Sequence, residues 1–168
     1  MAEGWNENHF TLYVRIRAAL DIIFRKRPDL RKQFAGDLES KQGWEESLAG
    51  RMALHLLAAR EYFVKHTGYG RPGAPNLTRE LADSEVYKIL MNQGSLFDDI
   101  NPRIRAVWNP FRPLYAELRH LDAQQDPAIK AKLRMARKLA NKRRKESAVH
   151  RAREKQKLRA RQLPLFKH

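Results

Sequence analysis

The stretch WEESLAGRMALHLLAAREYFVKH, residues 44–66, carries the clearest folding signal in this chain of 168 residues. Its apolar side chains recur every three or four residues, which is the spacing of one face of an α-helix. That face comprises Leu48, Met52, Leu56, Ala59 and Phe63, and it is widened by Leu54, Leu57, Ala58 and Tyr62. A stripe this wide is typical of a helix at the centre of a core, so we expect such a helix here, ending at Gly68.

Helical patterns also precede this stretch. Residues 9–26 are dense in apolar side chains and contain no turn former, which favours a helix over a strand. Pro28 suits the first position of a short second helix that reaches about Ala35. Gly36 and Gly43 are then expected to bracket a loop.

Glycine and proline punctuate the sequence after the central helix. Residues 68–76 contain three glycines and two prolines, and they predict a loop. Thr78 or Asp83 is expected to cap the next helix, which Gly94 would end. The predicted inward side chains of that helix are Leu81, Val86, Ile89 and Leu90.

Three dipeptides then place a capping side chain before a proline at the first helical position. They are Asn101-Pro102, Asn109-Pro110 and Asp126-Pro127, and they predict helices over 102–108 and 110–123 and a long helix from Pro127. The sequence therefore predicts an all-α fold, a compact multi-helix body with a long basic C-terminal helix projecting from it. We divide the chain into a near-neutral helical body (1–127), a basic helix (128–161) and a short apolar docking tail (162–168).

The charge of the chain is concentrated near its C-terminal end. The formal charge is +15, from 34 Lys and Arg against 19 Asp and Glu. Residues 128–168 hold 16 of the basic residues and only Glu146 and Glu154 as acids, a net of +14, whereas residues 1–127 come to +1. Charge packed this densely repels itself in isolation, so it implies a polyanionic partner.

The basic segment contains neither Gly nor Pro from Ala128 to Gln162, and helix formers dominate it. Beyond Asn141 its apolar residues are too sparse to bury, so residues 141–161 are expected to project into solvent as a helix that frays until a partner orders it. The part before Asn141 carries an apolar stripe that we expect to dock on the body: Ile129, Leu133, Ala136 and Ala140, with Met135 and Leu139 beside it.

Lysine and arginine occupy all faces of this predicted helix, which suits a helix lying between rows of phosphates. No aromatic residue lies between positions 116 and 165, so the segment predicts affinity for phosphate and little base specificity. The candidate nucleic-acid-binding residues are Lys130, Lys132, Arg134, Arg137, Lys138, Lys142, Arg143, Arg144, Lys145, Arg151, Arg153, Lys155, Lys157, Arg159 and Arg161.

A candidate second face interleaves basic and aromatic residues in the body. Arg103, Arg105 and Arg112 surround Trp108, and the 68–76 loop adds Tyr69 and Arg71, which could lie against a nucleotide. In the alternative interpretation the loop is a connector and the aromatic residues belong to the core. The core set would be Trp108, Phe111, Leu114, Tyr115 and Leu118.

Signals for catalysis are weak. The sequence has no cysteine, no histidine pair at metal-ligand spacing, no phosphate-binding loop and no nucleophile elbow. His55 and His66 share a face of the central helix, where packed or surface histidines are commoner than ligands. A metal-dependent nuclease would use Asp98 and Asp99 with Glu85, but helix capping is the favoured role of these acids. We therefore expect a non-enzymatic protein without catalytic residues, metal or cofactor.

The absence of cysteine, of a basic and apolar leader and of any apolar run of about 18 residues favours a cytoplasmic, nucleoid-associated protein without membrane contact. The pattern as a whole favours a DNA-binding accessory protein of bacterial, phage or plasmid replication, repair or mobile-element biology. An RNA-binding or ribosome-associated protein stays open, as does an inhibitor or adaptor whose tail binds an acidic protein or enters a nucleic-acid channel. A merely solvated tail is the remaining alternative.

Two short peptides end in Leu-Phe. The last of them, Gln162-Leu163-Pro164-Leu165-Phe166, resembles the peptide by which many bacterial polymerases and repair factors dock on the sliding clamp. The resemblance implies that Gln162 hydrogen-bonds in one subsite and that Leu165 and Phe166 fill an apolar pocket, with Leu163 as part of the motif. It covers five residues, and Pro164 departs from the usual small or acidic residue. The internal copy at 93–97 is expected to contribute Leu96 and Phe97 to the core instead.

Overall fold

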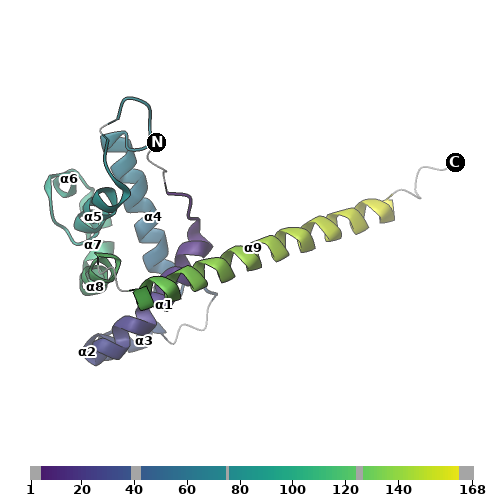
Figure 1. Ribbon diagram of the computed structural model, residues 1–168, viewed down its shortest axis with the longest axis horizontal. Helices are drawn as coiled ribbons and strands as arrows, with labels where there is room; N and C mark the ends of the chain where they lie inside the picture. The colour runs from purple at the N-terminus through teal and green to yellow at the C-terminus, as the bar shows by residue number, and fades with distance from the viewer. Residues whose placement is uncertain (1–4, 39–42, 75, 124–126, 163–168) are drawn as a thin grey trace.

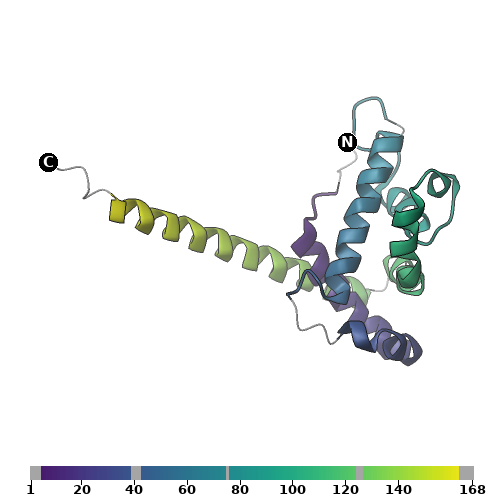
Figure 2. The same ribbon diagram turned by 180° about the vertical axis from the view of Figure 1, so that it is seen from behind.

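The computed structural model describes residues 5–38, 43–74, 76–123 and 127–162, with side chains of the last helix described at 134–136, 138, 139 and 141–160. Every regular element in these residues is a helix, as the sequence predicts. A cluster of helices forms the body, and one long helix leaves it (Figures 1 and 2). The elements are α1 (His9–Lys26), α2 (Pro28–Gln33), α3 (Ala35–Leu38), α4 (Leu48–Thr67), α5 (Arg79–Leu90), α6 (Ser95–Asp98), α7 (Pro102–Trp108), the 3-10 turn η1 (Asn109–Phe111), α8 (Arg112–Ala123) and α9 (Pro127–Gln162).

Helix α4 is central to the body, where it packs against both α1 and α5. Its buried face contains the predicted set of Leu48, Met52, Leu56, Ala59 and Phe63, which confirms the periodicity of residues 44–66. Each large side chain in such a face stabilises the fold by about 1.5–3 kcal/mol. Leu54 was expected to widen this face, but it lies outside it and is 53% exposed.

Local contacts shift several helix ends from their predicted positions. Helix α4 begins at Leu48 rather than at Trp44 because Ser47 caps it, with the Ser47 Oγ accepting the Gly50 N–H at 3.1 Å. Thr78 caps α5 as predicted, but this helix ends at Leu90 because Asn92 turns the chain at a φ of 60°. Gly94 therefore lies beyond α5 and directly precedes α6.

The remaining differences also have local causes. Gly36 lies in α3 rather than in a loop, because the Phe34 carbonyl accepts the N–H groups of the residues that follow Gly36. Asn109 does not cap α8, because its own N–H donates to the Arg105 carbonyl and it ends α7 instead. Leu81 lies on the outer face of α5 and is 56% exposed. Helix α9 begins at Pro127 as predicted, whereas Asp126 lies outside the described residues.

Helix α9 packs against α1 near its start and then extends away from the body (Figures 1 and 2). It is continuous to Gln162, and all side chains from 141 to 160 are exposed, which confirms that this part projects into solvent. The segment from Arg143 to Arg151 still passes beside the start of α1. Met135 and Leu139 were expected to pack against the body beside the apolar stripe. They are 72% and 48% exposed, so this expectation is wrong for these two side chains. Of the other stripe residues, Ala136 is partly buried, and the side chains of Ile129, Leu133 and Ala140 lie outside the described set. None of the described helices is both long and apolar enough to cross a membrane.

Candidate nucleic-acid interface

The projecting half of α9 is a dense array of exposed cations. Between residues 141 and 160 it carries nine Lys or Arg side chains and two carboxylates, and all of them are exposed. The exposed basic residues among those predicted are Arg134, Lys138, Lys142, Arg143, Arg144, Lys145, Arg151, Arg153, Lys155, Lys157 and Arg159. The side chains of Lys130, Lys132, Arg137 and Arg161 lie outside the described set.

Few of these cations have an anionic neighbour. Glu146 lies 3.9 Å from Lys142, and Glu154 lies 3.1 Å from Lys157, each on the surface of the helix. Surface pairs of this kind contribute little to stability. Among the described residues, the cations Arg143, Arg144 and Lys145 have no carboxylate partner, so their charge remains available to a polyanion.

A groove of about 560 Å³ lies where α9 passes the beginning of α1. One wall is the α9 segment from Arg143 to Arg151, which contributes three arginines, Glu146 and Ser147. The other wall comes from the body and consists of Asn8, Phe10 and Trp44. The fold thus places aromatic rings beside the basic helix, although the sequence of the helix contains none.

Trp44 is the hub of an aromatic cluster on the body side of this groove. Its ring centroid lies 4.7 Å from that of His9, 5.2 Å from Phe10 and 5.0 Å from Tyr13. All four rings are partly buried, so each is held by packing while part of it faces solvent. Tilted and edge-on arrangements such as these are favourable for aromatic pairs and restrain the rings.

The turn that carries Trp44 is fixed to the first turn of α4. The Ser47 hydroxyl donates to the Trp44 carbonyl at 2.5 Å, and the Nε2 of His9 lies 2.8 Å from the Gly50 carbonyl oxygen, to which it donates. A Cβ at Gly50 would lie only 2.1 Å from the Trp44 carbonyl oxygen. Glycine is therefore required at position 50, because the Trp44 turn approaches the helix closely there.

Only part of the candidate second face is exposed in the structure. Tyr69 is 3% exposed and packs against Trp5 and Phe63, with ring centroids 4.8 and 5.9 Å away, so its ring is not available to a base. Arg105 donates to the carbonyl oxygens of Ile100 and Asp98 and lies over the Phe97 ring, which gives it a structural role. Arg71, Arg103 and Arg112 remain exposed.

The aromatic residues of that face belong to the core instead, as the alternative interpretation holds. Trp108 and Phe111 are buried, and so are Leu114, Tyr115 and Leu118. Leu96 and Phe97 of the internal Leu-Phe peptide also pack, partly buried, against the core. The C-terminal Leu-Phe peptide lies outside the described residues except for the backbone of Gln162, which ends α9.

Three of the candidate catalytic groups, His55, His66 and Glu85, have local partners, whereas Asp98 and Asp99 are exposed. His55 Nδ1 lies 2.7 Å from the Tyr115 hydroxyl, and burial, with a smaller effect of Arg51, lowers the pKa of His55 to about 4. His66 Nδ1 lies 2.8 Å from the Tyr62 carbonyl oxygen, and Glu85 pairs with Lys88 at 2.6 Å. No group of three or more His, Cys, Asp or Glu in the described part of the chain is placed to hold a metal ion.

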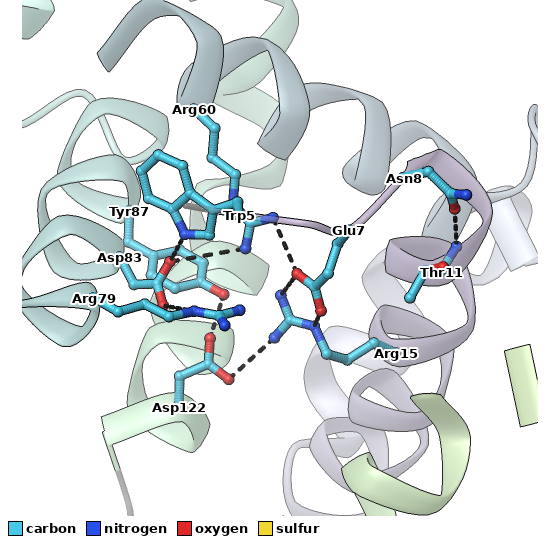
Figure 3. Close-up of polar contacts among 10 residues, drawn as sticks. All are labelled: Trp5, Glu7, Asn8, Thr11, Arg15, Arg60, Arg79, Asp83, Tyr87 and Asp122. Carbon is cyan, nitrogen blue, oxygen red and sulfur yellow. Dashed lines mark hydrogen bonds and ion pairs between the residues drawn. The ribbon is translucent and has the colours of Figure 1, made fainter. Parts of the chain in front are cut away.

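A polar network in the body, with Glu7 and Arg60 buried at its centre, was not predicted (Figure 3). Glu7 is 2% exposed at its side chain and pairs with Arg15 at 3.1 Å and with Arg60 at 3.0 Å. Asp122 contacts Arg15 at 3.5 Å and accepts the Tyr87 hydroxyl at 2.6 Å. No local pattern could have revealed this network, because Glu7 and Arg60 are 53 residues apart.

The network alters the proton affinities of its members. Burial lowers the pKa of Arg60, an effect that Glu7 opposes. Burial also raises the pKa of Asp83, although the Trp5 indole N–H donates to its Oδ1 at 2.6 Å and opposes the shift. Such groups hold the segment before α1 against α4 and α5, and thereby fix the positions of Asn8 and Phe10 beside the groove.

Comparisons with known protein families, curated proteins and solved structures find no match to this chain.

Proposed function

We propose that this chain is a non-enzymatic, DNA-binding accessory protein of replication, repair or mobile-element biology that grips phosphates with α9. The observation that carries the proposal is the array of exposed cations along residues 141–160, most of which have no carboxylate neighbour among the described residues. Each phosphate contact by Lys or Arg releases a condensed counterion, which makes binding favourable and dependent on salt.

The geometry of α9 supports this role. The helix projects beyond the body, so phosphates can approach its cations from several sides (Figure 1). The body contributes almost none of the net charge, because residues 1–127 sum to +1. The body anchors the start of α9 through the packing of α1 against it.

The test compares two variants of the full chain that remove the same charge. In the first, Lys142, Arg143, Arg144 and Lys145 are replaced by Gln, which has a similar helix propensity. In the control, the exposed Arg25, Lys26, Arg31 and Lys32 of α1 and α2 are replaced by Gln. We expect the first to weaken duplex DNA binding about 10- to 100-fold and to lower the salt slope by up to about 0.9 per lost contact, with little effect of the control.

Each other outcome selects an alternative. Stronger binding to RNA than to DNA at matched salt would favour the RNA-binding protein. Equal losses in the two variants would show that net charge, not α9, attracts the nucleic acid. If both variants retain full binding, α9 is not the nucleic-acid interface. Its charge would then suit an acidic protein surface, as the adaptor alternative holds.

We also propose that the tail docks on a bacterial sliding clamp, on the strength of the Gln162–Phe166 motif that follows the charged helix. An apolar peptide at the end of an exposed charged helix suits a partner pocket. Replacing Leu165 and Phe166 by Ala should abolish capture by the clamp and leave DNA affinity within about two-fold, because neither residue contributes charge. A double variant that still binds the clamp would contradict this assignment.

A further inference from the structure

We infer that the groove between Trp44 and α9 is a binding site for single-stranded nucleic acid, with bases against Phe10 and Trp44 and phosphates against Arg143, Arg144 and Arg151. The inference rests on the proposed function and adds to it a site that prefers an unpaired strand to a duplex. Its basis is the juxtaposition of an aromatic wall and a cationic wall across one groove.

The two walls match the two chemical parts of a nucleotide. Proteins that bind single strands combine a basic track for the backbone with rings on which bases stack. Here the basic track is the Arg143–Arg151 segment of α9, and the rings are Phe10 and Trp44. The groove volume of about 560 Å³ lies within the roughly 300–1,000 Å³ of sites that hold small organic ligands, so it suits one or two nucleotides.

The polar rim of the groove fits the same occupant. Asn8 Oδ1 accepts the Thr11 N–H at 2.8 Å, so the amide NH₂ of Asn8 is left as a donor for a phosphate or base oxygen. Helix α1 begins at this point, and the positive end of its dipole adds to the potential of the arginines. Glu146 also lines the groove and opposes an anion, although it lies 3.9 Å from Lys142.

A duplex would use only half of this site. Its bases are stacked on one another, so they offer grooves and phosphates but no open ring face. Phosphate contacts to α9 would remain, whereas Phe10 and Trp44 would contribute nothing. An unpaired strand engages both walls, and the aromatic wall therefore predicts a preference for single strands over duplexes of equal charge.

The test measures binding of the full chain to labelled oligonucleotides of roughly 12 nucleotides, within the range of site sizes of single-strand binders. The ligands are oligo-dT, oligo-U, a duplex and an abasic deoxyribose-phosphate strand, all at one salt concentration. We expect oligo-dT or oligo-U to bind about 10-fold more tightly than the abasic strand, because stacking is lost without bases. This comparison needs no variant of the protein.

Two variants locate the effect. Phe10→Leu and Trp44→Leu keep an apolar side chain but remove the π-face, and each should weaken single-strand binding about 5- to 10-fold while duplex binding changes less than about two-fold. Quenching of the tryptophan fluorescence by bound oligo-dT, absent with the abasic strand, should accompany binding. It should be lost in Trp44→Leu if Trp44, rather than Trp5 or Trp108, is the ring that contacts the bases. Circular dichroism and thermal unfolding verify that each variant is folded.

The outcomes separate this inference from the proposed function. Equal affinity for the abasic and base-bearing strands overturns the groove site whatever the variants do. If duplex and single strand bind alike and the α9 glutamine variant weakens both, the proposed function stands and the groove inference fails. If no nucleic acid binds at all, both fail together.

Discussion

Arginine plays opposite parts in the two regions of this molecule. In the body, Arg15 and Arg60 are enclosed, their side chains 15% and 5% exposed, and both pair with Glu7. In α9, Arg143 and Arg144 are exposed and have no carboxylate partner among the described residues. The residue type is therefore a poor guide to function, whereas the charge that surrounds it separates a structural arginine from one available to a ligand.

The small net charge of the body does not show that its arginines are paired with carboxylates. Residues 1–127 contain nearly equal numbers of cations and anions, and the fold brings many of them together across long sequence distances. Arg27, for example, contacts Glu117 at 2.7 Å across the body. Residues 128–168 hold two carboxylates for 16 cations, so a comparable neutralisation within α9 is impossible.

The largest effect is expected from breaking the buried pairing. Glu7→Gln removes the carboxylate that Arg15 and Arg60 share and leaves them only longer contacts, with Asp122 at 3.5 Å and Asp83 at 3.8 Å. It should destabilise the fold by about 3–5 kcal/mol, because breaking a buried ion pair is costly. Denaturant unfolding measures this loss. Glu85→Gln is the matched control, since its partner Lys88 lies on the surface and the pair contributes at most about 1 kcal/mol. Equal losses in the two variants would contradict the contrast drawn between buried and exposed charge.

A second change separates the two walls of the groove. Gly50→Ala places a Cβ against the Trp44 carbonyl oxygen and must displace the Trp44 turn, at a cost of about 1–3 kcal/mol. The cations of α9 are untouched, so duplex binding should persist while the preference for single strands declines. Gly36→Ala is the control, because nothing lies within 4 Å of a Cβ there. A Gly50→Ala protein that keeps its full single-strand preference would show that Trp44 does not serve the site.

The sequence predicted the helices far better than it predicted the site. Periodicity and capping located α1, α4, α5, α7 and the start of α9, because these signals depend on neighbouring residues. The exposed charge of α9 follows from composition in the same way. The aromatic wall does not, because Phe10 and Trp44 join α9 only through packing of α1 against it. Tyr69 was misassigned for the related reason that a loop residue can be buried by distant rings.

The body also contains a partly buried histidine, His55, whereas His150 of α9 is exposed. The pKa of His55 is about 4 in the folded state, below its ordinary value near 6.5, chiefly because the ring is buried. The unfolded chain therefore binds the proton more readily between these two pH values. The contribution of His55 to stability is fully present above about pH 6.5 and is lost as the pH drops towards 4. We expect this group to account for a loss of about 1–2 kcal/mol, reduced by residual solvent around the ring.

Thermal unfolding at several pH values measures this contribution. The loss between about pH 6.5 and 4 should be smaller in His55→Gln than in the parent protein, because glutamine cannot bind the proton. His66→Gln is the control, since His66 is exposed. The assignment of this pH dependence to His55 is contradicted if His66→Gln flattens the pH profile as much as His55→Gln does.

The smallest effect tests whether the groove or the whole of α9 attracts the anion. Glu146→Gln removes the carboxylate that lines the groove and releases Lys142, so it should tighten oligo-dT binding about two- to four-fold at low salt, with the gain declining as salt screens the charges. Glu154→Gln makes the same change in net charge two turns further along α9, where its partner Lys157 lies 3.1 Å away. A groove site predicts a larger gain from Glu146→Gln than from Glu154→Gln. Equal gains would mean that the strand responds to the total charge of the helix, in which case the aromatic wall would be incidental to binding.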